Sequence, residues 1–186
     1  MATLQWSKDL ELNVPAMDDT HREFVDLLAQ VENAEDAELP ALWLALIAHT
    51  EEHFGQEDRW MQATGFSSEN CHSTQHKVVL QIMKEGAEKA AQGDLTMVRG
   101  MTPELAGWFN YHAQTMDAAL AQHMAAVGFD TDSGHIATAA ALPTTMISGC
   151  GGACSQPADH QRQASHLQHV MQAAKGCCHP TAQGRF

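Results

Sequence analysis

The sequence predicts an all-α fold: an up-down-up-down antiparallel four-helix bundle with an N-terminal arm and a mostly irregular C-terminal tail. Apolar residues recur at helical spacing over four segments, and no segment shows the alternation that is typical of a strand. The loops between the segments are short, which makes neighbouring helices antiparallel. With 44% hydrophobic residues, the 186-residue chain has enough apolar side chains for a real core.

The chain is expected to begin with an extended arm over residues 1–17, which carries several apolar anchors. Pro15 disfavours helix in the residue before it. Asp18 or Asp19 can cap the helix that follows. This first helix is predicted to run to about Ala34.

The second helix is predicted to start around Pro40, because proline suits the first turn of a helix. It continues to about Ala63, where Thr64–Gly65 forms a stop signal. The third helix is predicted to run from near Ser68 to about Ala91, with an apolar stripe along one face.

The fourth helix is predicted to have Pro103 in an early turn and to end at Gly128, which completes a bundle domain over residues 1–128. After that point the composition changes. Residues 129–157 are rich in Ala, Thr, Gly, Ser and Pro, which is typical of a linker. Residues 158–186 form a Cys/His-containing tail with room for one short helix.

The charge distribution argues against several classes of partner. The formal net charge is -13, with 20 acidic and 7 basic residues in 1–128, and 3 of each in 129–186. An acidic front half disfavours nucleic acid and anionic membranes as partners. No apolar stretch approaches the roughly 18 residues of a membrane helix, and the first six residues do not resemble a signal peptide. We therefore expect a cytoplasmic protein.

Seven side chains of the kind that bind metals lie on the four predicted helices. In an antiparallel bundle all of them fall toward the same end, because the first and third helices start where the second and fourth finish. Imidazole suits iron, zinc and copper, and a carboxylate can bridge two cations. Bundle cores are known places for such metal pairs. The seven residues are His21, His53, Glu57, His72, His76, His112 and Asp117.

Two pairs among them have the spacing of neighbours on a helix. His53 and Glu57 are four residues apart, as are His72 and His76, so each pair shares one side of its helix. A single pair of this kind is weak evidence for a metal site. The prediction depends on the joint pattern.

The third pair does not fit the simple rule. His112 and Asp117 are five residues apart, about 140° around an ideal helix. Either a local bulge, which is common at functional positions, or an approach of Asp117 from the flank would bring them together. Glu57 and Asp117 also need positive charge if they are buried, and metal ions would supply it.

These residues resemble the hemerythrin family in its single-domain bacterial form, over residues 1–128. All seven ligand positions of the family are filled by the expected residue type. The motifs are Trp6-Ser7, Met17-Asp18-Asp19-Thr20-His21, His53-Phe54-Gly55-Gln56-Glu57, His72-Ser73-Thr74-Gln75-His76, and Trp108, His112 and Asp117 in the spacing of the family.

The resemblance implies a site for two non-haem iron ions with an oxo or hydroxo bridge, and dioxygen as the ligand. It implies reversible dioxygen binding for storage, delivery or sensing, with no catalytic residue. In the family pattern, one iron would be bound by His72, His76 and His112. The other would be bound by His21 and His53 and would keep an open position. The two irons would be bridged by Glu57 and Asp117.

The sequence departs from the family near the expected oxygen pocket. Asn110 stands where the family usually has an aliphatic residue that lines the pocket. Its amide could donate a hydrogen bond to the bound ligand, admit water, or face outward. The candidate pocket walls, which could equally be ordinary core residues, are Phe24, Leu28, Trp108 and Phe109.

Two alternative functions stay open at this point. A polar pocket suits a di-iron enzyme with peroxidase, oxidase or nitric-oxide chemistry. A metal-handling or redox-sensing protein would act through the tail, whose cysteines can bind metal or form disulfides. These tail residues are Cys150, Cys154, Cys177 and Cys178.

Overall fold

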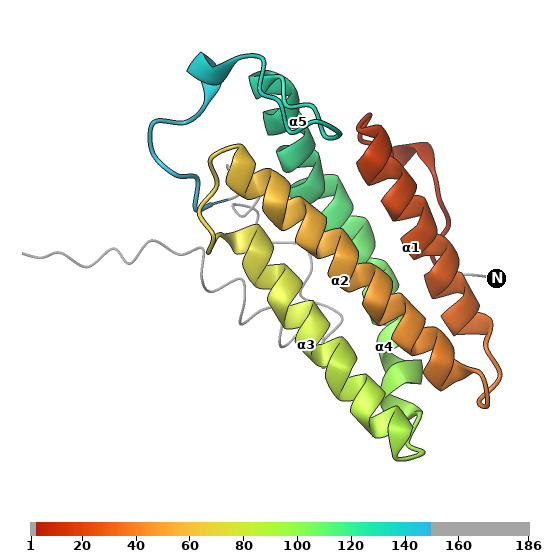
Figure 1. Cartoon of the computed structure of the whole chain (residues 1–186). Coiled ribbons are helices and arrows are strands. Elements are labelled where there is room, and N and C mark those ends of the chain that lie inside the picture. Colours follow the sequence, from red (N-terminus) through yellow and green to blue (C-terminus); the bar gives the residue numbers. More distant parts are fainter. Residues whose placement is uncertain (1–2, 150–186) are drawn as a thin grey trace, which may run out of the picture.

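The computed structural model of the chain describes residues 3–149. Four helical rods pack side by side and antiparallel, so the predicted all-α up-down-up-down bundle is confirmed (Figure 1). The first and third rods each pack on the second and the fourth. The rods are α1 (Pro15–Asn33), α2 (Leu39–Ala63), α3 (Cys71–Ala91), and a fourth made of α4 (Thr96–His112), the π-helical turn η2 (Ala113–Asp117) and α5 (Ala118–Val127).

The first helix starts earlier than predicted. Pro15 is its first residue, where the missing N–H has no helical partner to lose. Asp18 is therefore inside the helix and does not cap it. Its buried carboxylate instead accepts the backbone N–H of Leu12 at 2.7 Å, which fixes the arm against α1.

The second helix has the predicted bounds to within one residue, but the third starts at Cys71 and not near Ser68. Asn70 is its N-cap. The Asn70 side chain accepts the Ser73 N–H at 3.0 Å, and the Ser73 hydroxyl accepts the Asn70 N–H at 3.2 Å. This capping box satisfies two backbone donors at the helix start.

The prediction that Pro103 marks an early turn of the fourth helix is wrong. The helix begins at Thr96, and Pro103 lies in its interior on the exposed side. A proline there removes one backbone hydrogen bond. The turns before it nevertheless stay helical, because Val98 and Met101 are buried in the core.

The apolar core is divided into two clusters along the bundle. The smaller cluster lies at the end of the bundle where α1 and α3 start. The larger cluster extends from the opposite end and includes Phe24, Phe54 and Phe109. A layer of buried polar residues separates them along α1, α2 and the fourth rod. The smaller cluster consists of Met17, Trp60, Met61, Phe66, Leu120, Ala121 and Met124.

Residues 129–149, which we call the C-terminal strap, fold back against this end of the bundle (Figure 1). Gly128 ends α5 in a left-handed conformation, with a φ of 64°. Phe129 forms an isolated bridge with Ile136, and Phe66 forms one with Ile147. Phe129 and Ile147 both pack against the smaller apolar cluster. Residues 3–149 contain these two bridges and no strand.

Three backbone hydrogen bonds hold the strap on the loop between α2 and α3. Ser67 N–H donates to the Ile147 carbonyl at 2.9 Å, and Ile147 N–H donates to the Gly65 carbonyl at 3.0 Å. Cys71 N–H, at the start of α3, donates to the Ser148 carbonyl at 3.2 Å. The strap therefore supports the first turn of the helix that carries two of the predicted ligands.

The remainder of the predicted linker and the predicted tail, residues 158–186, lie outside the described residues. Within the described part, no helix combines the length and apolar character that crossing a bilayer requires. The tail cysteines Cys150, Cys154, Cys177 and Cys178 are likewise outside the described range.

Candidate metal centre

The seven predicted ligands lie together in the polar layer between the two apolar clusters. Each is at most 3% exposed, so water does not solvate the group. They come from all four rods, which means that the cluster exists only in the folded bundle. α1 supplies His21, α2 supplies His53 and Glu57, α3 supplies His72 and His76, α4 supplies His112, and the π-helical turn supplies Asp117.

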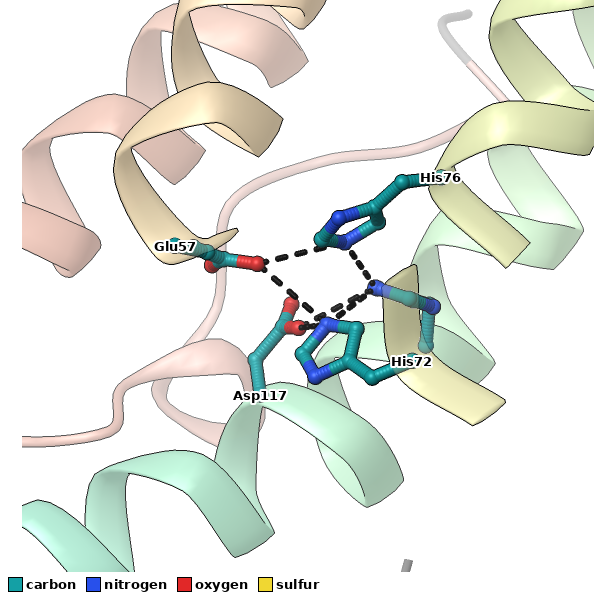
Figure 2. Close-up of side chains that lie close together, drawn as sticks. Glu57, His72, His76 and Asp117 are labelled. Carbon is teal, nitrogen blue, oxygen red and sulfur yellow. Dashed lines mark hydrogen bonds and ion pairs between the residues drawn. The ribbon is translucent and has the colours of Figure 1, made fainter. Parts of the chain in front are cut away.

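One part of the centre, the three-histidine half, consists of His72, His76 and His112. The Nε2 atom of His112 lies 2.9 Å from Nε2 of His72 and 3.2 Å from Nε2 of His76. Oε2 of Glu57 is 3.3 Å from Nε2 of both His72 and His76. Oδ1 of Asp117 is 2.9 Å from His72 Nε2 and 3.1 Å from His112 Nε2. Figure 2 shows Glu57 turned toward the rings of His72 and His76, and Asp117 turned toward the ring of His72.

The other part, the two-histidine half, consists of His21 and His53. Nε2 of His53 is 3.1 Å from Oε1 of Glu57. Nε2 of His21 is 3.3 Å from Oδ2 of Asp117 and 3.9 Å from Oε1 of Glu57. This half therefore has one imidazole fewer around the same two carboxylates.

The two carboxylates connect the halves because each divides its oxygens between them. Glu57 turns Oε1 toward the two-histidine half and Oε2 toward the three-histidine half. Asp117 turns Oδ2 toward the two-histidine half and Oδ1 toward the other. This is the geometry of a bridging carboxylate.

The π-helical turn explains how residues five apart can share the site. His112 is the last residue of α4, and Asp117 is the last residue of the π-helical turn. A π-helix pairs residues i and i+5, so it returns Asp117 to the side of the rod that carries His112. Of the two alternatives for this pair, the local bulge is therefore confirmed and the approach from the flank is wrong.

The donor atoms fit a pair of metal ions. Among the described residues, Glu57 Oε2, both carboxylate oxygens of Asp117 and His21 Nε2 are buried without a partner in hydrogen-bond geometry. An unsatisfied buried carboxylate costs free energy. The seven residues offer two ligand groups, of five and four members, which share Glu57 and Asp117 and whose atoms lie within 4.8 Å of one another. Imidazole with carboxylate suits iron, zinc and related metals.

The electrostatics of the centre favour ionised carboxylates. Burial by itself would raise the pKa of Glu57, but the electrostatic interaction with His53 and hydrogen bonds with neighbouring imidazoles hold that pKa well below its ordinary value. Burial and the nearby Glu57 would raise the pKa of Asp117, but interactions with His112 and His21 lower it well below the ordinary value. Both groups are therefore acceptors with full negative charge.

The histidines respond to this charge in different ways. Burial lowers the pKa of His21 and His72, but hydrogen bonding to Asp117 and Glu57 outweighs burial and raises the pKa to about 9 and about 10. Burial dominates for His112 and lowers its pKa to about 4. Protons on His21 and His72 thus supply positive charge in the metal-free chain, and metal binding would displace them.

Aromatic rings pack against the imidazoles on both sides. On the side of the two-histidine half, the Phe109 ring meets His21 edge-on at 5.1 Å between centroids and stacks on Phe24 at 4.3 Å. Trp108 lies instead against His112, at 4.4 Å. Phe54, which is not among the pocket walls predicted from the sequence, stacks on His76 at 3.9 Å.

Asn110 faces away from the centre. The residue is exposed, and its side-chain oxygen accepts a hydrogen bond from the Gln114 amide at 3.0 Å. Of the three roles considered for it, donation to a bound ligand and admission of water are therefore wrong.

Two further side chains contact the outer nitrogens of the histidines. Oδ1 of Asp58 lies 3.3 Å from Nδ1 of His76. Oε1 of Gln75 lies 3.4 Å from Nδ1 of His112. Neither residue is among the candidate site residues predicted from the sequence. For Gln75 a signal existed, because it follows His72 by three residues on one helix face; the contact of Asp58 depends on how α2 packs on α3.

Comparisons with known proteins agree with this arrangement. The family model of the hemerythrin HHE cation binding domain matches residues 12–124. A bacteriohemerythrin of Ralstonia nicotianae is 38% identical over 130 residues, which cover 70% of this chain and 95% of that protein. Bacteriohemerythrins of Pseudomonas aeruginosa are 23% identical over 124 residues, covering 63% of this chain and 79% of theirs. No solved structure gave a significant match. The chain belongs to the hemerythrin family.

Proposed function

We propose that this protein binds dioxygen reversibly at a non-haem di-iron centre, for storage, delivery or sensing. The observation that carries the proposal is the division of the Glu57 and Asp117 oxygens between two groups of histidines. Such an arrangement suits two cations held side by side with two carboxylate bridges. The relatives named bacteriohemerythrin support the same conclusion.

The two halves have different tasks in this proposal. His72, His76 and His112 would hold one iron, and His21 and His53 would hold the other with one imidazole fewer, which would leave room for dioxygen there. The iron pair, when bound, supplies the electrons that dioxygen takes up and returns. The protein contributes neutral imidazoles and two negative charges, which balance much of the charge of two ferrous ions.

The surroundings of the two-histidine half favour holding dioxygen. Phe24 and Phe109 are at most 1% exposed and form an apolar wall beside His21. A dry wall at the open position slows irreversible oxidation of the metals. The enzyme alternative depended on Asn110 as a polar group in the pocket, and its outward position removes that support.

The proposal is tested with the full chain, reduced and loaded with ferrous iron without air. We expect two irons per chain and an optical spectrum that changes on exposure to oxygen and returns under vacuum over repeated cycles. One-way oxidation with turnover of peroxide would contradict reversible binding.

The bridging role has its own test. Replacing Glu57 by Ala removes one bridge, and we expect iron content to fall from two ions toward none. Glu52→Ala, an exposed position on the same helix, is the control and should keep both irons. If the Glu57→Ala protein retains two irons and its oxygen-dependent spectrum, Glu57 does not bridge.

A further inference from the structure

Gln75 is a buried amide that contacts His112 of the three-histidine half and the neighbouring Trp108. It is 6% exposed. Its Oε1 atom lies 3.2 Å from Nε1 of Trp108 and 3.4 Å from Nδ1 of His112. A single amide oxygen therefore faces two ring nitrogens from α4.

Trp108 determines which way this amide is turned. An indole nitrogen can only donate a hydrogen bond, so the group that faces it has to be the amide oxygen and not the NH₂ group. The same oxygen can only accept from His112. For a hydrogen bond to form, Nδ1 of His112 has to carry the proton, which leaves the lone pair on Nε2.

That lone pair is directed into the centre. Nε2 of His112 is the atom that lies 2.9 Å and 3.2 Å from the Nε2 atoms of His72 and His76, and 3.1 Å from Oδ1 of Asp117. A metal ligand of this kind is oriented by the partner of its other ring nitrogen, and the partner also raises its basicity.

We infer that Gln75 is a positioning residue that holds His112 in the Nδ1–H tautomer, with Nε2 toward the metal, and that Trp108 sets the orientation of the Gln75 amide. The inference rests on the proposed di-iron function. It adds a link between helices: α3 provides two ligands and also the group that orients a third ligand on α4.

The two-histidine half lacks a comparable device. Among residues 3–149, the Nδ1 atoms of His21 and His53 have no hydrogen-bond partner. The orienting contacts gather on the half that is saturated by protein ligands, and the half with the open position is left less constrained. We therefore expect loss of Gln75 to weaken the binding of the metal in the three-histidine half first.

The test uses two variants of Gln75 and a matched control. Gln75→Leu removes the acceptor at similar size, while Gln75→Glu keeps an acceptor oxygen. Gln81→Leu alters an exposed glutamine on the same helix, whose amide binds only Glu85 in the structure. The first measurement is made on the metal-free full chain at neutral pH, where ¹⁵N NMR of the histidine rings reports which nitrogen of His112 carries the proton.

We expect Nδ1–H in the wild-type chain, in Gln81→Leu and in Gln75→Glu, and loss of this preference in Gln75→Leu. The second measurement is anaerobic titration with ferrous iron. Removal of an orienting partner typically weakens metal binding 10–100-fold, and we expect a loss in this range for Gln75→Leu and recovery in Gln75→Glu.

A further variant, Trp108→Phe, keeps Gln75 but removes the indole donor. The amide is then free to turn, and we expect a mixture of His112 tautomers. This variant decides the question if Gln75→Leu does not fold. An unchanged His112 tautomer in both Gln75→Leu and Trp108→Phe would overturn the inference.

The two proposals fail in different ways. If the wild-type chain does not take up two irons but the His112 tautomer still depends on Gln75, the di-iron function is wrong and the positioning role stands. If two irons bind with equal affinity to the wild-type and Gln75→Leu chains, the positioning role is wrong and the function stands.

Discussion

Buried charge is the main physical problem at the scale of single residues. Glu57 and Asp117 are both fully buried, and each is close to imidazoles of both halves. In the metal-free chain the negative charge of the two carboxylates is balanced by protons on His21 and His72, because the pKa values of these histidines are raised. Two metal ions would balance it without protons, so the metal-free and loaded proteins should respond differently to pH.

We predict that the metal-free protein loses stability as the pH rises from 6.5 toward 10. Burial lowers the pKa of His21 and His72, but Asp117 and Glu57 outweigh it and raise the values from 6.5 to about 9 and about 10. A pKa that is higher in the folded state gives stability that is complete below the unfolded value and is lost as the pH passes through the folded value.

Thermal unfolding of the metal-free and metal-loaded proteins over this pH range checks the prediction. In the loaded protein the two imidazoles are neutral ligands, and the decline should be much smaller. The same decline in both forms would show that protons on His21 and His72 do not stabilise the metal-free bundle.

A second prediction at this scale concerns Asn110. From the sequence alone, Asn110→Leu should lengthen the life of the oxygenated protein, because an aliphatic residue would dry the pocket. The structure reverses this expectation, since Asn110 is exposed and hydrogen-bonded to Gln114. We expect the lifetime of the oxygenated form, followed by its optical spectrum, to stay within about twofold of wild type, as for surface substitutions of at most about 0.5 kcal/mol. A several-fold longer life would place Asn110 in the pocket.

At the scale of the elements, the π-helical turn has the largest effect on the site. The fourth rod continues through it, so that α4 and α5 both present apolar faces to the bundle, with Leu105 and Leu120 at 0% and 1% exposure. Between the apolar faces of α4 and α5, the π-helical turn contains one residue more than a regular α-helical turn would. It therefore places Asp117 in the centre without rotating α5.

Because the π-helical turn contains one extra residue, we predict opposite results for deleting a residue from it and inserting a residue into it. Deleting the exposed Gln114 should convert the turn into regular α-helix, leave Leu120 and Met124 in the core, and change the melting temperature little. Inserting one alanine after Gln114 should rotate α5 by about 100° and expose its apolar face, with a loss of several kcal/mol, since each buried side chain contributes about 1.5–3 kcal/mol.

Circular dichroism with thermal unfolding compares the two variants. Equal destabilisation by the deletion and the insertion would mean that the bundle needs the wide turn for more than the placement of Asp117.

At the scale of the whole molecule, the strap connects residues 129–149 to the start of α3, the helix that carries His72 and His76. Ile147 and Ser148 hydrogen-bond to the α2–α3 loop and to the first residue of α3, and Ile147 packs with Phe129 on the smaller apolar cluster. Removal of everything after Gly128 would consequently disturb the bundle as well as the tail. A cut after Gly149 separates the two effects.

We predict that a chain ending at Gly149 keeps the melting temperature, iron content and oxygen response of the full chain. A chain ending at Gly128 should be less stable by about 2 kcal/mol, the order expected when the burial of two half-buried apolar side chains, Phe129 and Ile147, is lost. Chemical denaturation and metal analysis of both truncations test this. Altered iron content or oxygen response in the chain that ends at Gly149 would favour the alternative in which the tail carries the function.

Local patterns of the sequence determined the main features of this protein. Helical spacing of apolar residues gave the four rods, and short loops gave their antiparallel order, because both depend on neighbours along the chain. The same reasoning placed all seven candidate ligands toward one end of the bundle. The capped start of α3 was missed by three residues, although the Asn70–Ser73 pair lies in the sequence.

Contacts between distant segments were decided by the tertiary structure alone. The early start of α4 depends on burial of Val98 and Met101, and the outward position of Asn110 depends on the rotation of the fourth rod. The contact of Gln75 with Trp108 joins residues 33 positions apart in the chain. Such pairings follow from packing between helices, whose free energy depends on side chains that no local pattern brings together.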